Sequence, residues 1–229
     1  MESSALARRQ ALLGLILVVP VPSIGAWAGL VAAPGPVGQT ICALSQVWIL
    51  LVPALWARLV ERQPHRANLS TSGWSVGVVT GVAAAAAIVL FYVFVARHAF
   101  DLSAMGPTVA EAGIDSRVKY VAVALYWTFV NALIEEYVWR WFVATRLEVL
   151  TPRWVAIVLS AVFFSVHHYV ALGAYVAPSA AWVGTFGVFV AAVLWSWLYL
   201  RYRSLLSPYV SHVIADAAIF AVGWFVIFG

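Results

Sequence analysis

Charged residues are scarce in this sequence, and their scarcity argues against a soluble domain. Of the 229 residues, 10% are charged and 64% are hydrophobic, and the mean hydropathy is +0.96. A typical soluble domain carries about 25% charged and about 45–50% apolar residues. The composition therefore predicts an all-α fold, a polytopic bundle of helices within a membrane, because helices satisfy their own backbone hydrogen bonds in lipid.

Several other features are missing as well. The single cysteine, Cys42, has no second cysteine for an internal disulfide. The sequence has no internal repeat, low-complexity tract or appended polar domain. Its net charge of +4 comes from basic residues in short connections between apolar runs, which is typical of membrane topology. We therefore expect membrane lipids among the partners, and no nucleic acid.

Seven apolar runs approach or exceed the roughly 20 residues that a helix needs to cross a bilayer. The first looks like a secretory signal with a cleavage site at 26–28, but it continues past that site, which favours an uncleaved span. We expect residues 1–116 to supply about three transmembrane helices and a connecting loop, and residues 117–229 to form a four-helix core. Asp115 or Ser116 is expected to cap the fourth span. The runs cover about 11–33, 38–60, 73–95, 117–147, 153–172, 181–200 and 205–228.

The distribution of basic residues predicts the orientation. One set of span ends carries only Arg97, Arg117 and Lys119, whereas the other set is rich in arginine. Because the richer set faces the cytoplasm, the amino terminus is expected there. The compact, Ala- and Trp-rich sequence further indicates a prokaryotic cell membrane. The richer set is Arg8, Arg9, Arg58, Arg62, Arg66, Arg146, Arg153, Arg201 and Arg203.

Three charged residues interrupt the fourth apolar run: Glu135, Glu136 and Arg140. Each costs at least about 2.5–3.5 kcal/mol in hydrocarbon, so partners must receive them. Glu136 and Arg140 are four residues apart and share a helix face, which predicts an ion pair. Glu135 lies about 140° from Arg140 around an α-helix and is left to face a cavity, as suits a general base. The alternative is a salt-bridge cluster that only locks helices together.

Two further runs carry histidines. His167 and His168 lie at mid-membrane depth in the fifth run and point about 100° apart, so we expect only one to face a site. His212 and Asp216 lie four apart on one face of the seventh run. The alternative to a functional role is that this pair only forms a structural hydrogen bond. Glu135 lies about 18 Å and His168 about 22 Å from the cytoplasmic ends of their helices. This similar depth predicts that these groups converge.

The sequence offers no well-placed serine or cysteine nucleophile and no His-Glu-x-x-His motif. Two mechanisms fit the remaining groups. In one, glutamate and histidine deprotonate a water that attacks a carbonyl, while the other pair binds the oxyanion. In the other, the same residues ligate a divalent metal ion that activates the water. Residue spacing does not separate them.

The ordered set Glu135-Glu136-x-x-x-Arg140, Phe164-x-x-x-His168 and His212-x-x-x-Asp216 resembles the motifs of a known family. This is the CPBP family, the CAAX-protease and bacteriocin-processing, or Abi, group of intramembrane proteases, and the resemblance covers about residues 119–228. It implies glutamate-type peptide hydrolysis without a metal or cofactor, on a peptide or protein that enters from the cytoplasmic face or the membrane. It also implies roles for the residues: Glu135 and His168 activate water, His212 and Asp216 shape the oxyanion site, and Glu136 and Arg140 support them.

Two positions depart from or compete with that pattern. Asp216 stands where the eukaryotic prenyl-protein proteases often have asparagine, and an ionised aspartate cannot donate a hydrogen bond to an oxyanion. It must stay protonated, or instead orient His212 or the water. His167 is an alternative to His168, because Phe163-x-x-x-His167 also fits the spacing. The competing class of function is a non-catalytic immunity or scaffold protein that retains the polar core for packing or partner binding.

Overall fold

The computed structural model describes residues 2–33, 35–62 and 67–229, and this part of the chain contains helices and no strand. Seven helical stretches within it are long and apolar enough to cross a membrane, judged by length and composition. These findings confirm the all-α, multi-pass membrane fold expected from the sequence. Arg66, one of the arginines used to predict the orientation, lies outside the described residues.

The first three spans are nearly regular helices with short π-helical segments (η) at two ends. Span one breaks briefly before Val21 and then continues, span two is one helix, and span three ends in a short turn. A separate short helix, α6 (Met105–Glu111), follows. The elements are α1 (Glu2–Val18), α2 (Val21–Trp27), η1 (Ala28–Ala32), α3 (Pro36–Leu59), α4 (Trp74–Phe91), η2 (Tyr92–Ala96) and α5 (Arg97–Ala99).

The fourth span changes its winding along its length. Ser116 begins it, and its hydroxyl oxygen accepts a hydrogen bond from the Lys119 backbone N–H at 3.4 Å, so the expected cap is confirmed. Two π-helical segments lie on either side of the short α-helix that ends at Glu135, and Glu136 begins the second of them. Such wide turns are frequent at functional sites. The elements are α7 (Arg117–Leu125), η3 (Tyr126–Asn131), α8 (Ala132–Glu135), η4 (Glu136–Ala144) and α9 (Thr145–Leu150).

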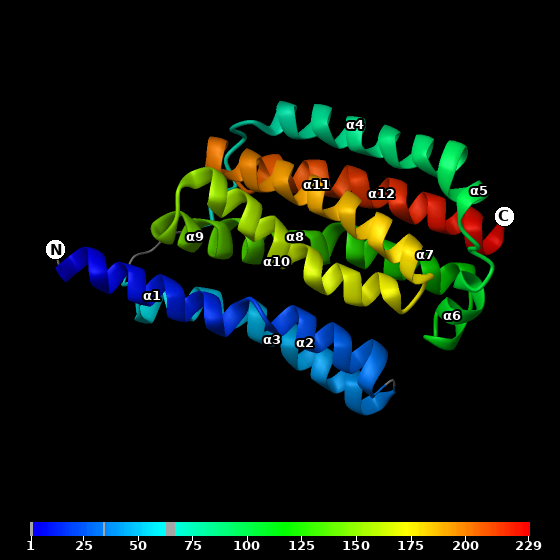
Figure 1. Ribbon diagram of the computed structural model, residues 1–229, viewed down its shortest axis with the longest axis horizontal. Helices are drawn as coiled ribbons and strands as arrows, with labels where there is room; N and C mark the ends of the chain where they lie inside the picture. Colours follow the sequence, from blue (N-terminus) through cyan, green and yellow to red (C-terminus); the bar gives the residue numbers. More distant parts are fainter. Residues whose placement is uncertain (1, 34, 63–66) are drawn as a thin grey trace.

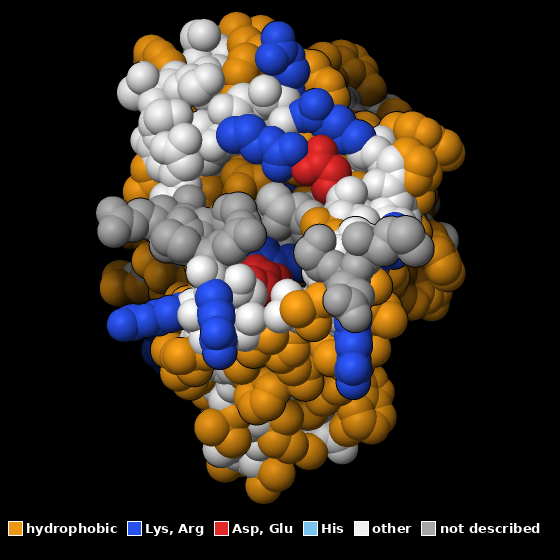
Figure 2. Space-filling view, turned by 90° about the vertical axis from the view of Figure 1, so that its left-hand side faces the viewer, with side chains coloured by type: hydrophobic (Ala, Val, Ile, Leu, Met, Phe, Trp, Pro, Cys, Tyr) orange, Lys and Arg blue, Asp and Glu red, His pale blue; other side chains and the backbone are white. Residues whose placement is uncertain are grey.

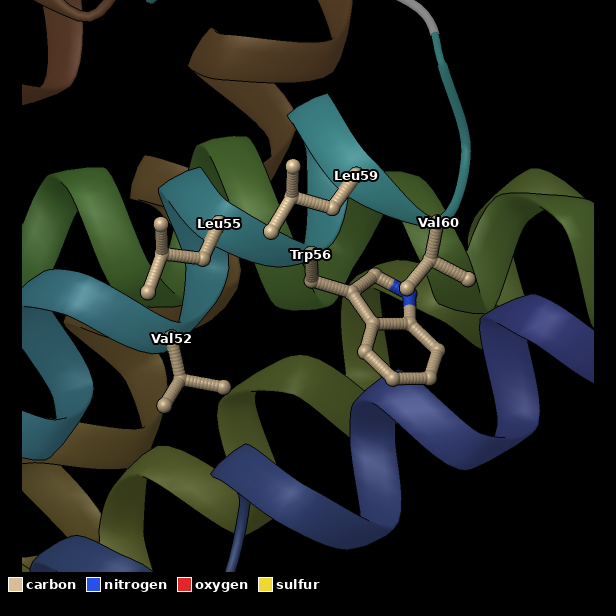
Figure 3. A pocket seen from close by; sticks show the side chains of 5 residues that line it. All are labelled: Val52, Leu55, Trp56, Leu59 and Val60. Carbon is tan, nitrogen blue, oxygen red and sulfur yellow. The ribbon is translucent and has the colours of Figure 1, made fainter.

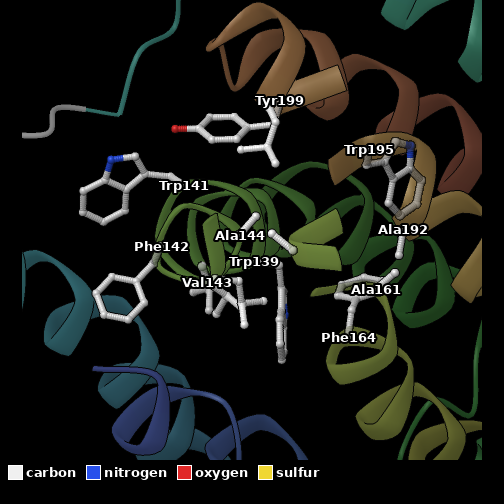
Figure 4. Packing of buried hydrophobic residues seen from close by; sticks show 14 of the residues in the cluster. Trp139, Trp141, Phe142, Val143, Ala144, Ala161, Phe164, Ala192, Trp195 and Tyr199 are labelled. Carbon is white, nitrogen blue, oxygen red and sulfur yellow. The ribbon is translucent and has the colours of Figure 1, made fainter. Parts of the chain in front are cut away.

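Three long helices complete the chain: α10 (Arg153–Gly173), α11 (Pro178–Tyr202) and α12 (Leu206–Phe228). Pro152 precedes α10 and Pro178 opens α11, where a missing N–H costs nothing. The largest buried side chains gather around η4, and aromatic groups from α10 and α11 close over it (Figure 4). The fourth span is therefore the centre of the hydrophobic core.

The helices lie side by side along a common direction (Figure 1). α1, α2 and α3 form one flank and contact the rest through α9, α10 and η4. α4 forms the opposite flank and packs against α12. Between the flanks, the fourth span is surrounded by α10, α11 and α12. The polar residues of the fourth, fifth and seventh spans are thereby brought to the middle of the bundle.

Two glycines allow α4 to approach α12 closely. A Cβ on Gly77 would lie 2.2 Å from the backbone oxygen of Ser207, and a Cβ on Gly81 would lie 2.9 Å from Cα of Ser211. Small residues permit such contact between membrane helices. The Thr80 hydroxyl adds a hydrogen bond to Ser211 Oγ at 3.2 Å. α12 is therefore held against α4 at two points. One is Ser211, next to His212, and the other is Ser207, about one turn earlier.

Replacing Gly77 with alanine is expected to destabilise the bundle by about 1–3 kcal/mol, because the added methyl group meets backbone rather than a flexible side chain. Detergent-solubilised protein unfolded by denaturant gives the measurement. Gly187→Ala on α11 is the control, since no described atom lies within 4 Å of its Cβ and alanine favours a helix. Equal stability of the two variants would contradict the close contact between α4 and α12.

Arginines gather at the end of the bundle that holds the amino terminus, and acidic side chains lie among them (Figure 2). Glu61 Oε2 lies 2.6 Å from Arg146 Nη2, and Glu148 Oε2 lies 2.6 Å from Arg203 Nη2. These pairs join the second, fourth and sixth spans at one surface. A charged surface of this kind fits a position at the edge of a bilayer rather than within it.

Candidate functional site

A buried polar cluster lies where the fourth, fifth and seventh spans meet. Glu135 ends α8 and exposes 8% of its surface, while Glu136 and Arg140 in η4 are fully buried. α10 contributes His167 and His168, and α12 contributes His212 and Asp216. The convergence expected from the sequence is therefore confirmed by the contacts among these side chains.

Glu135 lies between two imidazoles. Its Oε1 is 3.5 Å from Nε2 of His167, and its Oε2 is 3.6 Å from Nε2 of His212. Both separations exceed a good hydrogen bond, and catalytic contacts are often long before substrate arrives. The carboxylate is thus held among nitrogen atoms without being locked into a tight ion pair with Arg140.

Glu136 makes the closer contacts instead. Its Oε2 forms an ion pair with Arg140, 3.2 Å from Nε and without hydrogen-bond geometry, and its Oε1 is hydrogen-bonded to Nδ1 of His212 at 2.9 Å. The pairing of Glu136 with Arg140 is confirmed. The contact with His212 was not foreseen, and it orients that ring. The Glu136 carboxylate accepts a hydrogen bond from Nδ1–H, so Nε2 points toward Glu135 and Asp216. Asp216 Oδ1 lies 3.6 Å from this Nε2.

Both histidines of α10 reach the cluster. Glu135, His167 and His168 each offer a ligand atom within 4.8 Å of the others, and the two rings are 4.2 Å apart. The expectation that only one would face the site is wrong. Although the two residues are neighbours on the helix, a ring nitrogen of each lies within 4.8 Å of a Glu135 carboxylate oxygen.

The two rings are held differently. His168 Nδ1 lies 3.1 Å from the Phe164 carbonyl oxygen, which accepts its proton and leaves the Nε2 lone pair free. His167 stacks on Trp139 at 5.4 Å between centroids and 7° between planes. Its Nδ1 has no hydrogen-bond partner among the described residues. The Nε2 atom of His168 is therefore available as a hydrogen-bond acceptor, while the His167 ring is held mainly by stacking on Trp139.

Aromatic side chains form the wall of the cluster. Arg140 Cζ lies 4.6 Å from the Phe164 ring centroid and 5.5 Å from that of Trp195. Trp195 also stacks on His212 at 3.9 Å, and its indole N–H donates to Ser211 Oγ at 3.1 Å. Trp195 was not among the predicted site residues, because the sixth span carries no charged residue near it. Phe164, expected from its motif, contacts both α10 histidines and His212.

An apolar pocket lies elsewhere, at the end of α3 (Figure 3). Its lining residues are Val52, Leu55, Trp56, Leu59 and Val60. The Trp56 indole lies against Gly14 of α1. None of the polar residues of the cluster lines it, so this pocket is separate from the candidate site.

The fold and the cluster define a multi-pass integral membrane protein with a buried glutamate–histidine site. Among known families, the model of the Rce1-like family, described as type II CAAX prenyl endopeptidase Rce1-like, matches residues 117–218. The match covers less than half of the chain, agrees with the family that the motifs indicate, and supports a membrane endopeptidase of that type. Searches of curated proteins and of solved structures found no match.

Proposed function

We propose that this protein is an intramembrane endopeptidase in which Glu135 and His168 activate a water molecule for attack on a peptide bond. The observation that carries the proposal is the meeting of Glu135 with the α10 and α12 histidines, inside the segment that matches the endopeptidase family. Residues 117–229 would form the catalytic core. Arg140 and Glu136 would hold this core together rather than act on substrate.

In the proposed reaction, water sits between the Glu135 carboxylate and the Nε2 lone pair of His168. Glu135 takes a proton from the water as the water oxygen attacks the carbonyl carbon. The carbon–nitrogen bond of the peptide then breaks, and the proton passes from Glu135 to the leaving amine. His212 stands on the other side of Glu135 and can donate from Nε2 to the oxyanion when its ring carries both protons. Glu136 and Asp216 would balance the charge of that ring.

The substrate is proposed to be a peptide or protein held at the membrane. The matched family is named for CAAX prenyl endopeptidases, so a prenylated CAAX peptide is the first substrate to test. The arginine-rich end suggests that the amino terminus lies in the cytoplasm, and that substrate enters from that face or from the bilayer.

The first experiment incubates purified protein in detergent with a farnesylated CAAX peptide and with the same peptide lacking the lipid. We expect cleavage of the lipidated peptide, identified by product mass, at equal rates with and without EDTA. This follows from the proposed roles of Glu135 as the proton acceptor and of His168 as the hydrogen-bond acceptor for the water. Failure to cleave either peptide would contradict the proposal. Loss of cleavage in EDTA, restored by one divalent ion, would replace the metal-independent mechanism.

A second experiment separates the two α10 histidines. His168→Ala is expected to lower kcat by about 10²–10⁴-fold, because it removes the ring whose lone pair faces the water. His167→Ala is expected to have the smaller effect. Both rates are measured on the same peptide, at substrate concentrations that resolve kcat from KM. A larger loss for His167→Ala would transfer the water-activating role to His167.

A further inference from the structure

We propose that Glu135, His167 and His168 also form a binding site for a single transition-metal ion of the Zn²⁺ type. The observation is geometric: each side chain directs one ligand atom into the same space, and these atoms lie within 4.8 Å of one another. His167 is the distinctive member, because the proposed reaction assigns the activation of water to Glu135 and His168 and gives His167 no role. The site therefore depends on a residue that the proposed reaction does not require.

The ligand types select the metal. Two imidazole nitrogens and one carboxylate oxygen suit zinc and its neighbours, whereas magnesium and calcium prefer sites built from oxygen alone. Three protein ligands leave a fourth tetrahedral position for water, as in many zinc sites. An ion of this class would thus bind with one exchangeable position, facing the space between Glu135 and the histidines.

The distances fit a site that closes slightly around its ion. Bonds of about 2.0–2.2 Å at tetrahedral angles place ligand atoms roughly 3.3–3.5 Å apart. His167 Nε2 and Glu135 Oε1 are already separated by 3.5 Å. The widest pair must close by at most about 1.5 Å from 4.8 Å, which side-chain rotation supplies.

The surroundings favour a cation with two charges. The carboxylates of Glu135, Glu136 and Asp216 lie around His212, and Arg140 is the one guanidinium in contact with them among the described residues. With these carboxylates ionised, two negative charges lack a partner if His212 is neutral, and one lacks a partner if His212 is protonated as the proposed oxyanion contact requires. Such charges are costly away from water. A divalent ion would balance them. Protons on the histidines would compete with it, because the ligating nitrogens must be deprotonated.

One ligand is also oriented in the way that metal ligands usually are. The His168 Nδ1–H donates a hydrogen bond to the Phe164 carbonyl oxygen, which directs Nε2 into the cluster. Metal-ligating histidines commonly give their other N–H to a carbonyl or carboxylate in this manner. Trp139, stacked on His167, restricts the second ring without using either of its nitrogens.

Metal binding would block the proposed reaction, because it takes the carboxylate oxygen and the His168 lone pair that the water needs. This consequence rests on the proposed function, whereas the binding itself does not. We therefore expect Zn²⁺ to inhibit cleavage and EDTA to restore it. A protein that binds the metal but cleaves no peptide would support the metal site and contradict the proposed peptidase function.

The test uses protein without a polyhistidine tag, stripped with EDTA, freed of chelator and titrated with Co²⁺ in detergent. We expect a visible absorption band that saturates at one ion per chain and disappears on addition of Zn²⁺. His167→Ala should weaken binding by more than the roughly 10–100-fold that loss of an outer-shell partner costs. His98→Ala, an exposed histidine on α5, is the matched control and should bind as wild type does.

His167→Gln provides a second variant, and the elution profile in detergent identifies any variant that fails to fold. Equal Co²⁺ affinity in folded wild type, His167→Ala and His167→Gln would overturn the proposal. So would a wild-type protein that gives no band and retains no Zn²⁺ by elemental analysis. Inhibition by Zn²⁺ that persists unchanged in a folded, active His167 variant would place the inhibitory ion elsewhere and also count against it.

Discussion

Replacing Glu135 with glutamine is expected to lower kcat for peptide hydrolysis by about 10²–10⁴-fold while leaving the fold intact. Glutamine keeps the size of the side chain but cannot take a proton from water. It also removes a buried charge that has no tight ion pair, since the nearest imidazole nitrogens are 3.5 and 3.6 Å away. The measurement is the cleavage rate of the lipidated CAAX peptide, beside the denaturation midpoint of the same preparation.

Glu148→Gln is the control for this substitution, because Glu148 lies on the same span but pairs with Arg203 at the end of the bundle. Its cleavage rate should match that of the wild type. The combination of lost activity and retained stability separates a catalytic glutamate from one that only holds helices together. If Glu135→Gln cleaved as fast as wild type, Glu135 would not be the base. A loss of stability without any hydrolysis to lose would favour the scaffold alternative.

Replacing Arg140 with methionine is expected to have the opposite profile and to lower the free energy of unfolding by about 3–5 kcal/mol. The guanidinium is fully buried, lies 3.2 Å from Glu136, and is enclosed by the rings of Phe164 and Trp195. Methionine fills much of the space but leaves the Glu136 carboxylate without its cation. Denaturant titration in detergent micelles measures the loss.

Lys119→Met is the matched control, because Asp115 and Lys119 form an ion pair with the same spacing at the bundle surface. Both side chains are more than half exposed, so water replaces the lost partner and no measurable change is expected. The hydrogen bond from Lys119 lowers the pKa of Asp115, but that exposed carboxylate stays hydrated without it. An Arg140 variant as stable as the Lys119 variant would mean that the buried pair contributes nothing to the fold.

Much of the fold and of the site composition could be predicted from the sequence, because lipid makes charge and hydropathy informative. Each uninterrupted apolar run became a helix, and the polar groups within such runs had to meet one another. Glu136 and Arg140 pair as their spacing required. His212 and Asp216 share a helix face for the same reason.

The rest depended on features that spacing does not encode. The π-helical segments η3, before α8, and η4, which begins at Glu136, alter the angular positions that α-helical geometry assigns. Side-chain rotation then allowed both His167 and His168 to reach Glu135. Trp195 joined the site through tertiary packing alone. The close contact of α4 with α12 uses Gly77 and Gly81, and tertiary packing decides which helix these glycines face.

The seating of α12 on α4 has a consequence for how the protein can be divided. The family match starts at residue 117, so the helix that supports the Ser207 and Ser211 side of α12 belongs to the unmatched part of the chain. A truncated chain that kept only the matched segment would lose this brace and present small polar side chains to the lipid. We therefore expect a fragment that folds to need α4 in addition to the matched segment.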